Sequence, residues 1–156
     1  MALTIDTKKQ IGPLDKDAIK KILPHREPIL LIDEIISCIP GKYARGRLHL
    51  TGQEDFFRGH FPGNPVMPGV LQIEAVAQTG AVAVLSLPEL QGRIALFGGA
   101  TNIRFPRIVR PGDVMEMEIE IIKLSAIAGK GKGCTQVNGE VCSEGEFLFV
   151  IPKQEA

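Results

Sequence analysis

The chain has 156 residues, of which 44% are hydrophobic and 23% are charged, a composition typical of globular proteins rather than disordered or fibrous ones. Eighteen basic residues balance 18 acidic ones, so the chain as a whole has no field that would collect nucleic acid or an acidic membrane. Tyr43 is the one tyrosine and tryptophan is absent, which leaves few side chains for base stacking. We therefore expect one globular domain that binds no nucleic acid.

Two features of the sequence bear on where the protein resides. The uncharged stretch between Glu74 and Glu89 has 14 residues, fewer than the roughly 18 that a membrane span needs, and the N-terminus lacks the apolar stretch of a signal peptide. Cys38, Cys134 and Cys142 are scattered and form no Cys-x-x-Cys motif, a pattern typical of reducing compartments. The sequence predicts a cytoplasmic protein with free thiols and no membrane span.

The first predicted elements are a tail, a short helix and a hairpin of strands. Residues 1–13 are expected to form a polar tail. Asp15 is placed to cap a short helix that ends at Pro24. Residues 29–37, rich in Leu and Ile, and the alternating residues 43–51 predict two strands joined by a proline-glycine turn.

The rest of the chain predicts one enclosed helix and several strands. Residues 53–68 contain closely spaced Pro and Gly, which indicates a constrained loop. Residues 69–86 are apolar nearly all round and predict a helix that must be enclosed. The apolar period then changes to two, which predicts strands at 93–105, 115–121, 127–137 and 140–151.

The order of these elements indicates an α+β domain over residues 14–151, with an antiparallel sheet wrapped around the helix and a polar tail at 152–156. Such a sheet leaves edges uncovered, so we expect self-association. If Asn138-Gly139 is a two-residue hairpin turn, Cys134 opposes Ser143 and the cysteines at 134 and 142 point to opposite faces. The glycine-lysine run at 129–133 is expected to be a flexible, basic strand entry.

Glu74 and His60 are the candidate catalytic residues. Glu74 lies inside the enclosed helix, where an unpartnered carboxylate is so costly that it finds a donor or takes up a proton, and such acids cluster at functional sites. A structural hydrogen bond to Gln78, one turn later, is the alternative. His60 lies 14 residues earlier in the glycine-proline loop that leads into the same helix, which favours a convergent histidine and carboxylate pair.

Pro68 and Gly69 mark a candidate oxyanion site at the start of the helix. Pro68 suits the first helical position, and Gly69 lets a ligand approach the exposed backbone amides. Those amides and the helix dipole would polarise a carbonyl oxygen as negative charge develops on it. The alternative is an ordinary helix start that proline initiates.

Other candidate sites are weaker. The histidines at 25, 49 and 60 lack zinc-ligand spacing, so we expect no metal site. Three arginines recur every third residue, which favours either solvated surface or a basic rim suited to a small acidic partner: Arg104, Arg107 and Arg110.

Three segments resemble a known family: LPHREPILLIDEI at 23–35, GHFPGNPVMPGVLQIEAVAQ at 59–78 and FPRIVRPGD at 105–113. They are similar to the glutamate-type 3-hydroxyacyl-[acyl-carrier-protein] dehydratases of bacterial type II fatty-acid synthesis. The similarity runs from about residue 15 to 151. It implies a hot-dog fold, with six antiparallel strands around one long central helix, and homodimers with two composite active sites, assembled as a trimer of dimers. It also implies a substrate carried on acyl carrier protein and no cofactor.

The resemblance also implies roles for individual residues. His60 and Glu74 match the catalytic pair, Gly69 matches the backbone donor to the thioester carbonyl, and the Val66 carbonyl orients the histidine. Glutamate at 74, rather than aspartate, favours the plain dehydratase over the sister type that also isomerises the double bond. Supporting positions are Gln78, Phe61 and Pro68, and two positions depart from the common pattern: Glu27 and Thr101.

The implied reaction converts a (3R)-3-hydroxyacyl thioester into a trans-2-enoyl thioester. It needs a base for the α-hydrogen and an acid for the hydroxide leaving group, which His60 and a protonated Glu74 would supply. The opposite assignment of the two roles serves the reverse hydration and stays open. The alternatives are a hot-dog thioesterase, which has no need of His60 in its glycine-proline frame, and a noncatalytic acyl-binding module, which tolerates loss of both groups. The three arginines near residue 107 are the candidate docking cluster for the carrier protein.

Overall fold

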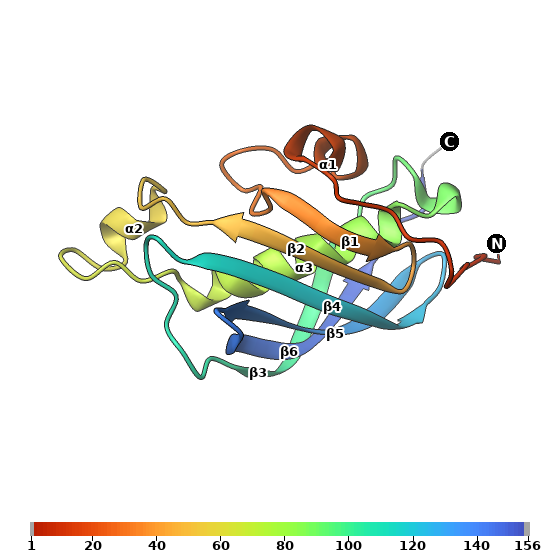
Figure 1. Ribbon diagram of the computed structural model, residues 1–156. Helices are drawn as coiled ribbons and strands as arrows, with labels where there is room; N and C mark the ends of the chain where they lie inside the picture. The colour runs from red at the N-terminus through yellow and green to blue at the C-terminus, as the bar shows by residue number, and fades with distance from the viewer. Residues whose placement is uncertain (1, 155–156) are drawn as a thin grey trace.

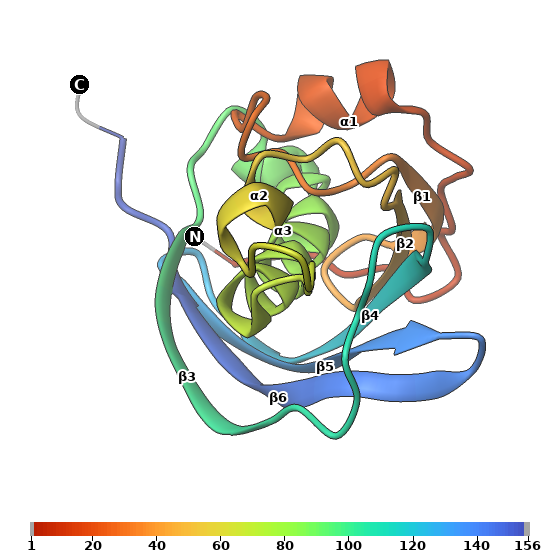
Figure 2. The same ribbon diagram turned by 90° about the vertical axis from the view of Figure 1, so that its left-hand side faces the viewer.

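A computed structural model describes residues 2–154 and shows one antiparallel sheet curled around a long helix (Figure 1). The six strands lie in the order β1-β2-β4-β5-β6-β3. Figure 2 looks along the helix α3 (Gly69–Leu85) and shows the sheet wrapping around it. The predicted α+β hot-dog arrangement is therefore confirmed. The other elements are α1 (Lys16–Ile22), β1 (Glu34–Ile39), β2 (Tyr43–His49), α2 (Phe56–Gly59), η1 (Pro88–Leu90), β3 (Leu96–Arg104), β4 (Val114–Leu124), β5 (Ala128–Val137) and β6 (Glu140–Val150).

The N-terminal third agrees with expectation at the start of α1 and differs from it at the start of β1. The cap is confirmed, because the Asp15 carboxylate accepts a hydrogen bond from the amide of Ala18 at 2.8 Å. The strand expected from residue 29 begins only at Glu34. Residues 29 and 30 instead donate their amides to the carbonyl of Arg26, at 3.0 and 3.1 Å, and form a turn. A local run of apolar residues cannot distinguish such a turn from a strand.

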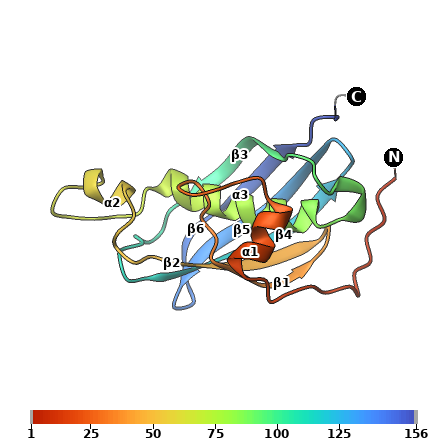
Figure 3. The ribbon, with the colours of Figure 1, turned by 90° about the horizontal axis from the view of Figure 1, so that it is seen from above.

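The segment before α1 lies against β1. Backbone hydrogen bonds of 2.8 and 2.9 Å join Ile11 and Cys38 in both directions, and Leu14 pairs with Ile35. Figure 3 shows α1 on the helix side of the sheet, where it packs against α3 and β1. Within residues 2–154 the β1 edge is thus partly covered, whereas β3 forms the opposite edge and exposes most of its side chains.

No helix within residues 2–154 is both long and apolar enough to cross a membrane.

The central helix is enclosed along its second half only. Every residue from 78 to 85 is buried, whereas Val70 in the first turn is 70% exposed. The first half, which carries Glu74, lies toward the end of the sheet from which α2 projects (Figure 1). The open half of α3 is therefore where a ligand or a second chain can reach the helix.

The glycine-lysine run lies within β5, and its glycines lie on the buried face of the strand. Gly129, Gly131 and Gly133 are all buried, and Cβ atoms there would meet neighbouring strands or α3. The expectation of a flexible strand entry is therefore wrong. Alternating glycines on one face of the strand allow the central helix to lie close to the sheet.

We expect Gly133→Ala to lower the free energy of unfolding by about 1–3 kcal/mol, because overpacking forces the backbone to shift. The added Cβ would lie 2.6 Å from the carbonyl oxygen of Glu118 and 2.7 Å from a methyl carbon of Val76. Urea denaturation at fixed protein concentration measures the change. Gly59→Ala is the control, because nothing lies within 4 Å of its added Cβ. A loss no larger than that of the control would contradict the packing role.

The hairpin between β5 and β6 turns at Asn138 and Gly139, both with positive φ, as predicted. Its register differs from the prediction, because a bulge after Thr135 makes that residue pair with Ser143 and makes Cys134 pair with Glu144. The Thr135 and Ser143 hydroxyls are buried and lie 2.6 Å apart. All three cysteines are free, as expected.

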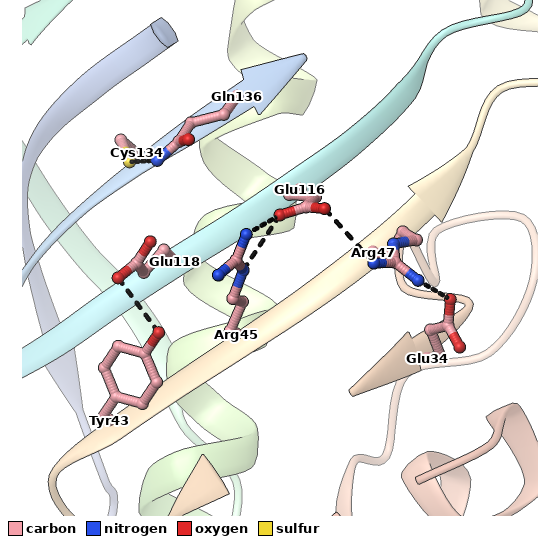
Figure 4. Close-up of polar contacts among 8 residues, drawn as sticks. All are labelled: Glu34, Tyr43, Arg45, Arg47, Glu116, Glu118, Cys134 and Gln136. Carbon is pink, nitrogen blue, oxygen red and sulfur yellow. Dashed lines mark hydrogen bonds and ion pairs between the residues drawn. The ribbon is translucent and has the colours of Figure 1, made fainter. Parts of the chain in front are cut away.

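The convex face of the sheet carries a network of paired charges (Figure 4). Arg45 and Arg47 both donate to Glu116, and Tyr43 donates to Glu118 at 3.0 Å. The Arg45 hydrogen bond holds the pKa of Glu116 below its ordinary value. Burial, with the Glu118 carboxylate beside it, raises the pKa of Tyr43 to about 12. This face is therefore a solvated surface whose charges are largely matched.

Candidate active site

Glu74 lies in a cavity between α3 and the β3 end of the sheet. The polar wall consists of His25, Glu74 and Gln78, and the far wall is apolar and aromatic, with Ile119, Phe97, Phe147 and Phe149 among its residues. Ala77 and Ala81 also line it, on the same face of the helix as Glu74. A polar end joined to an apolar end suits a ligand that has a reactive head and a hydrocarbon chain.

Gln78 holds the Glu74 carboxyl group in place. Its Nε2 donates to Oε1 of Glu74 at 2.9 Å, so the hydrogen bond that the sequence offered as the structural alternative for Glu74 is present. The same amide group donates to the carbonyl of Ile29 at 2.7 Å and accepts from the amide of Leu31 at 2.8 Å. Gln78 therefore ties the turn before β1 to the helix, a role that the sequence analysis did not foresee.

Glu74 is less enclosed than predicted. Its side chain keeps 25% of its surface exposed in the single chain, because α3 is fully covered only from residue 78 onward. The expected apolar enclosure is therefore incomplete within one protomer.

His60 ends a short helix that the sequence analysis did not predict, α2. Its ring Nδ1 lies 2.8 Å from the carbonyl oxygen of Val66, and the Val66 amide donates to the His60 carbonyl at 2.8 Å. Phe61 stacks on the imidazole with the ring centroids 3.9 Å apart, and Phe61 and Asn64 exchange two backbone hydrogen bonds. A carbonyl can only accept, so Nδ1 carries a hydrogen and Nε2 of the neutral ring keeps a free lone pair.

A single chain does not bring His60 and Glu74 into contact. Among residues 2–154 no hydrogen bond or ion pair joins them, and the cavity at Glu74 is lined by His25 rather than His60. Figure 1 shows the loop after α2 projecting beyond the start of α3. The predicted pairing of His60 with Glu74 is therefore absent from the single chain over residues 2–154.

The start of α3 differs slightly from expectation, because Pro68 is the N-cap and Gly69 is the first helical residue. None of the hydrogen bonds in the described part of the chain uses the Gly69 amide, as is usual for the first turn of a helix. An added Cβ at Gly69 would lie 2.8 Å from a ring carbon of Phe105. The glycine thus lets Phe105 pack against a helix start whose amide is available to an oxyanion.

The three candidate docking arginines are exposed, but two are paired with acids on β6. Arg104 forms an ion pair with Glu144, and Arg107 forms one with Glu140 at 3.0 Å. Arg110 donates to the side chain of Asn64 at 3.0 Å, in the loop that carries His60. The basic rim is therefore weaker in net charge than the sequence predicts.

His25 is a site residue that the sequence analysis placed in a motif but gave no role. Its Nε2 lies 3.8 Å from Oε1 of Glu74. Its Nδ1 is buried and has no hydrogen-bond partner among the described residues. The only signal in the sequence was its place in the segment at 23–35, because no local pattern links residue 25 to residue 74.

Comparisons with known proteins agree on one family. Residues 23–150 match the family described as FabA-like domain. Curated relatives named 3-hydroxyacyl-[acyl-carrier-protein] dehydratase FabZ include one from Moorella thermoacetica, which is 55% identical over 138 residues, 88% of this chain and 96% of the relative. Those from Caldicellulosiruptor saccharolyticus and Clostridium botulinum are both 53% identical, covering 88% and 90% of this chain and 98% and 97% of their own length.

Solved structures share the fold at low identity. The dehydratase heterocomplex ApeI:P from Xenorhabdus doucetiae matches with a TM-score of 0.75 and 17% identity, over 92% of this chain and 93% of that chain. A hypothetical thioesterase from Streptococcus pneumoniae, solved with coenzyme A, matches with a TM-score of 0.57 and 9% identity, over 75% and 84%. At these identities the likeness establishes the fold alone.

Proposed function

This chain belongs to the FabA-like family, and we infer from that membership that it is a hydro-lyase of fatty-acid synthesis. It removes water from 3-hydroxyacyl chains carried on acyl carrier protein. The identity of 53–55% to named dehydratases, over nearly their whole length, supports this activity. We propose further that the substrate is the (3R) isomer, that the product is the trans-2-enoyl thioester, and that His60 and Glu74 perform the chemistry.

The observation that carries the assignment of roles is the contact between His60 Nδ1 and the Val66 carbonyl, 2.8 Å. It leaves Nε2 free to take the α-hydrogen of the substrate as a proton. The electrons of that C–H bond form the new double bond, and the hydroxyl leaves as water with a proton from Glu74. The Gly69 amide stabilises the negative charge that develops on the thioester oxygen, a contribution typically worth about 10²–10³ in rate. No electron leaves the substrate, so the chain's own groups balance the reaction.

We propose that the active site is shared between two subunits. Two features of the single chain support this: His60 and Glu74 are apart, and the β3 edge is unpaired within residues 2–154. The resemblance favours homodimers, three of which assemble into a trimer of dimers. A cytoplasmic location belongs to the same proposal and agrees with three free cysteines.

One assay tests the function against its alternatives. The protein is incubated with a 3-hydroxyacyl thioester, and enoyl thioester and free thiol are measured together. We expect enoyl product without free thiol. Free thiol would identify a thioesterase, and neither product from a folded protein that binds the thioester would identify a noncatalytic acyl-binding module.

We propose that acyl carrier protein docks near Arg107. We expect Arg107→Glu to raise KM for carrier-bound substrate by about 2- to 5-fold and to flatten its salt dependence, because exposed charges act mainly on encounter and are screened by salt. Turnover of a short thioester mimic should hardly change. Arg107 is the better test than Arg110, which holds the His60 loop through Asn64.

Lys42→Glu is the matched control for this docking test. Lys42 is a half-exposed base paired with Glu120 at 3.2 Å. It follows Gly41, whose amide donates to the carbonyl of Ala83 near the end of α3, far from the helix start. Equal losses with carrier-bound and mimic substrates would assign Arg107 a structural role. The docking cluster would then be sought among four other basic residues: Lys20, Lys21, Arg26 and Lys130.

A further inference from the structure

We propose that His25 is a positioning residue for Glu74. Together with Gln78 it directs a hydrogen-bond donor at Oε1 of the carboxyl group, so that Oε2 is the oxygen that transfers the proton. The inference rests on the proposed dehydration and adds to it a residue outside the pair His60 and Glu74. His25 lies in the segment between α1 and β1, and it lines the cavity beside Glu74.

Two nitrogen atoms approach the same carboxyl oxygen. Gln78 Nε2 lies 2.9 Å from Glu74 Oε1, and His25 Nε2 lies 3.8 Å from it. The second distance is longer than a hydrogen bond. Hydrogen bonds in unfilled active sites are often long and tighten when the substrate binds. A movement of less than about 1 Å would bring the imidazole to bonding distance.

The surroundings of the ring decide which nitrogen carries the hydrogen. His25 Nδ1 is buried and has no partner among residues 2–154, so a hydrogen placed there would be a buried donor without an acceptor, which is costly. Nε2 faces a carboxyl oxygen, which accepts. The neutral imidazole therefore carries its hydrogen on Nε2 and presents it to Glu74.

The backbone that carries His25 is firmly held. The guanidinium of Arg26 donates to the carbonyls of Lys20, Leu23 and His25, at 3.1, 2.9 and 2.7 Å. The far end of the same segment is tied to α3 by the side chain of Gln78. A segment fixed at both ends holds the imidazole over the carboxyl group, as a positioning role requires.

The arrangement fits an acid that gives up one proton. In the protonated carboxyl group Oε1 is the carbonyl oxygen and accepts, while Oε2 carries the hydrogen that goes to the leaving hydroxyl. As that proton leaves, negative charge spreads to Oε1, and donors there bind it more strongly than before. Interactions that strengthen toward the transition state raise kcat rather than lower KM. Loss of the His25 donor should therefore lower kcat.

Three substitutions at residue 25 differ in how far a side-chain hydrogen-bond donor extends toward Glu74, and together they test the proposal. In His25→Gln the amide nitrogen extends about as far as Nε2, in His25→Asn it reaches only as far as Nδ1, and His25→Leu has no donor. We expect kcat to fall about 10- to 100-fold in His25→Asn and His25→Leu, the range for a hydrogen bond to a charged group. His25→Gln should keep kcat within about 3-fold, and KM should stay within about 3-fold in all three.

His49→Leu is the matched control, because His49 lies on the convex face with its Nε2 3.5 Å from Glu34. Its kcat should equal that of the wild type. A His25→Gln variant no more active than His25→Asn, or a rise in KM at constant kcat, would overturn the positioning role in favour of packing. If His25→Leu does not fold, the Gln and Asn variants decide. A wild-type protein without enoyl product would overturn the proposed function as well, whereas an active wild type with unaffected variants overturns the role of His25 alone.

Discussion

His60→Ala and Glu74→Gln are each expected to reduce dehydration by at least about 10²–10⁴-fold, the range typical of a general acid or base. If His60 and Glu74 act as a unit, as proposed, the double variant should lose little more than either single one. His60→Ala removes the ring whose Nδ1 is held by Val66. Glu74→Gln keeps the shape of the side chain beside Gln78 and removes the transferable proton.

The measurement is kcat/KM for a 3-hydroxyacyl thioester, with circular dichroism to confirm that each variant is folded. His49→Ala and Glu120→Gln are the controls, because both side chains are more than half exposed, at 53% and 62%, and lie away from the cavity. Both controls should retain full activity. Strict additivity of the two losses in log rate would mean that His60 and Glu74 act independently, and a folded, fully active His60→Ala variant would refute the mechanism.

Local sequence signals predicted the elements whose causes are local. The helix expected at 69–86 is found at Gly69–Leu85, because a continuous apolar run without internal proline defines it. The Asp15 cap depends on a hydrogen bond to a residue only three positions later, so the sequence around residue 15 is enough to predict it. The irregular segment before β1 and the bulge after Thr135 instead contact partners 47 and 63 residues away, because Gln78 binds the amide of Leu31 and Gln72 binds the Thr135 hydroxyl. Those partners are fixed by tertiary packing, which periodicity does not contain.

The candidate site also combines features with local causes and features that depend on tertiary packing. His60, Glu74 and the helix start at Gly69 could be proposed from the sequence, because their residue types, spacing and proline-glycine frame lie within 15 consecutive residues. The position of His25 beside Glu74 could not be predicted in this way, because it arises only when the segment before β1 folds back onto α3. The partial exposure of Glu74 was also missed, since an apolar helix pattern does not say which half of the helix the sheet covers.

Mixing His60→Ala protein with Glu74→Gln protein is expected to restore activity that neither has alone. The cavity at Glu74 lacks His60 within one chain, so we place the missing histidine on the neighbouring subunit. In a mixed dimer one site then carries both substitutions and the other carries none. Random pairing in an equal, fully exchanged mixture gives mixed dimers half of the time, so about a quarter of wild-type activity should return.

Exchange is established before activity is read, for example with subunits of two different masses separated by native mass spectrometry. Mixing wild type with the double variant, His60→Ala and Glu74→Gln in one chain, is the matched control. Shared sites then leave the mixed dimer with no intact site, because each site contains one substituted residue, whereas sites within one chain leave one intact. The single-variant mixture should therefore gain activity, while the control mixture should fall from the half expected without exchange to about a quarter. An inactive single-variant mixture after proven exchange, with a control that stays at half, would show that both groups come from one chain. In that case the loop after α2 would have to fold back over α3 to bring His60 to Glu74.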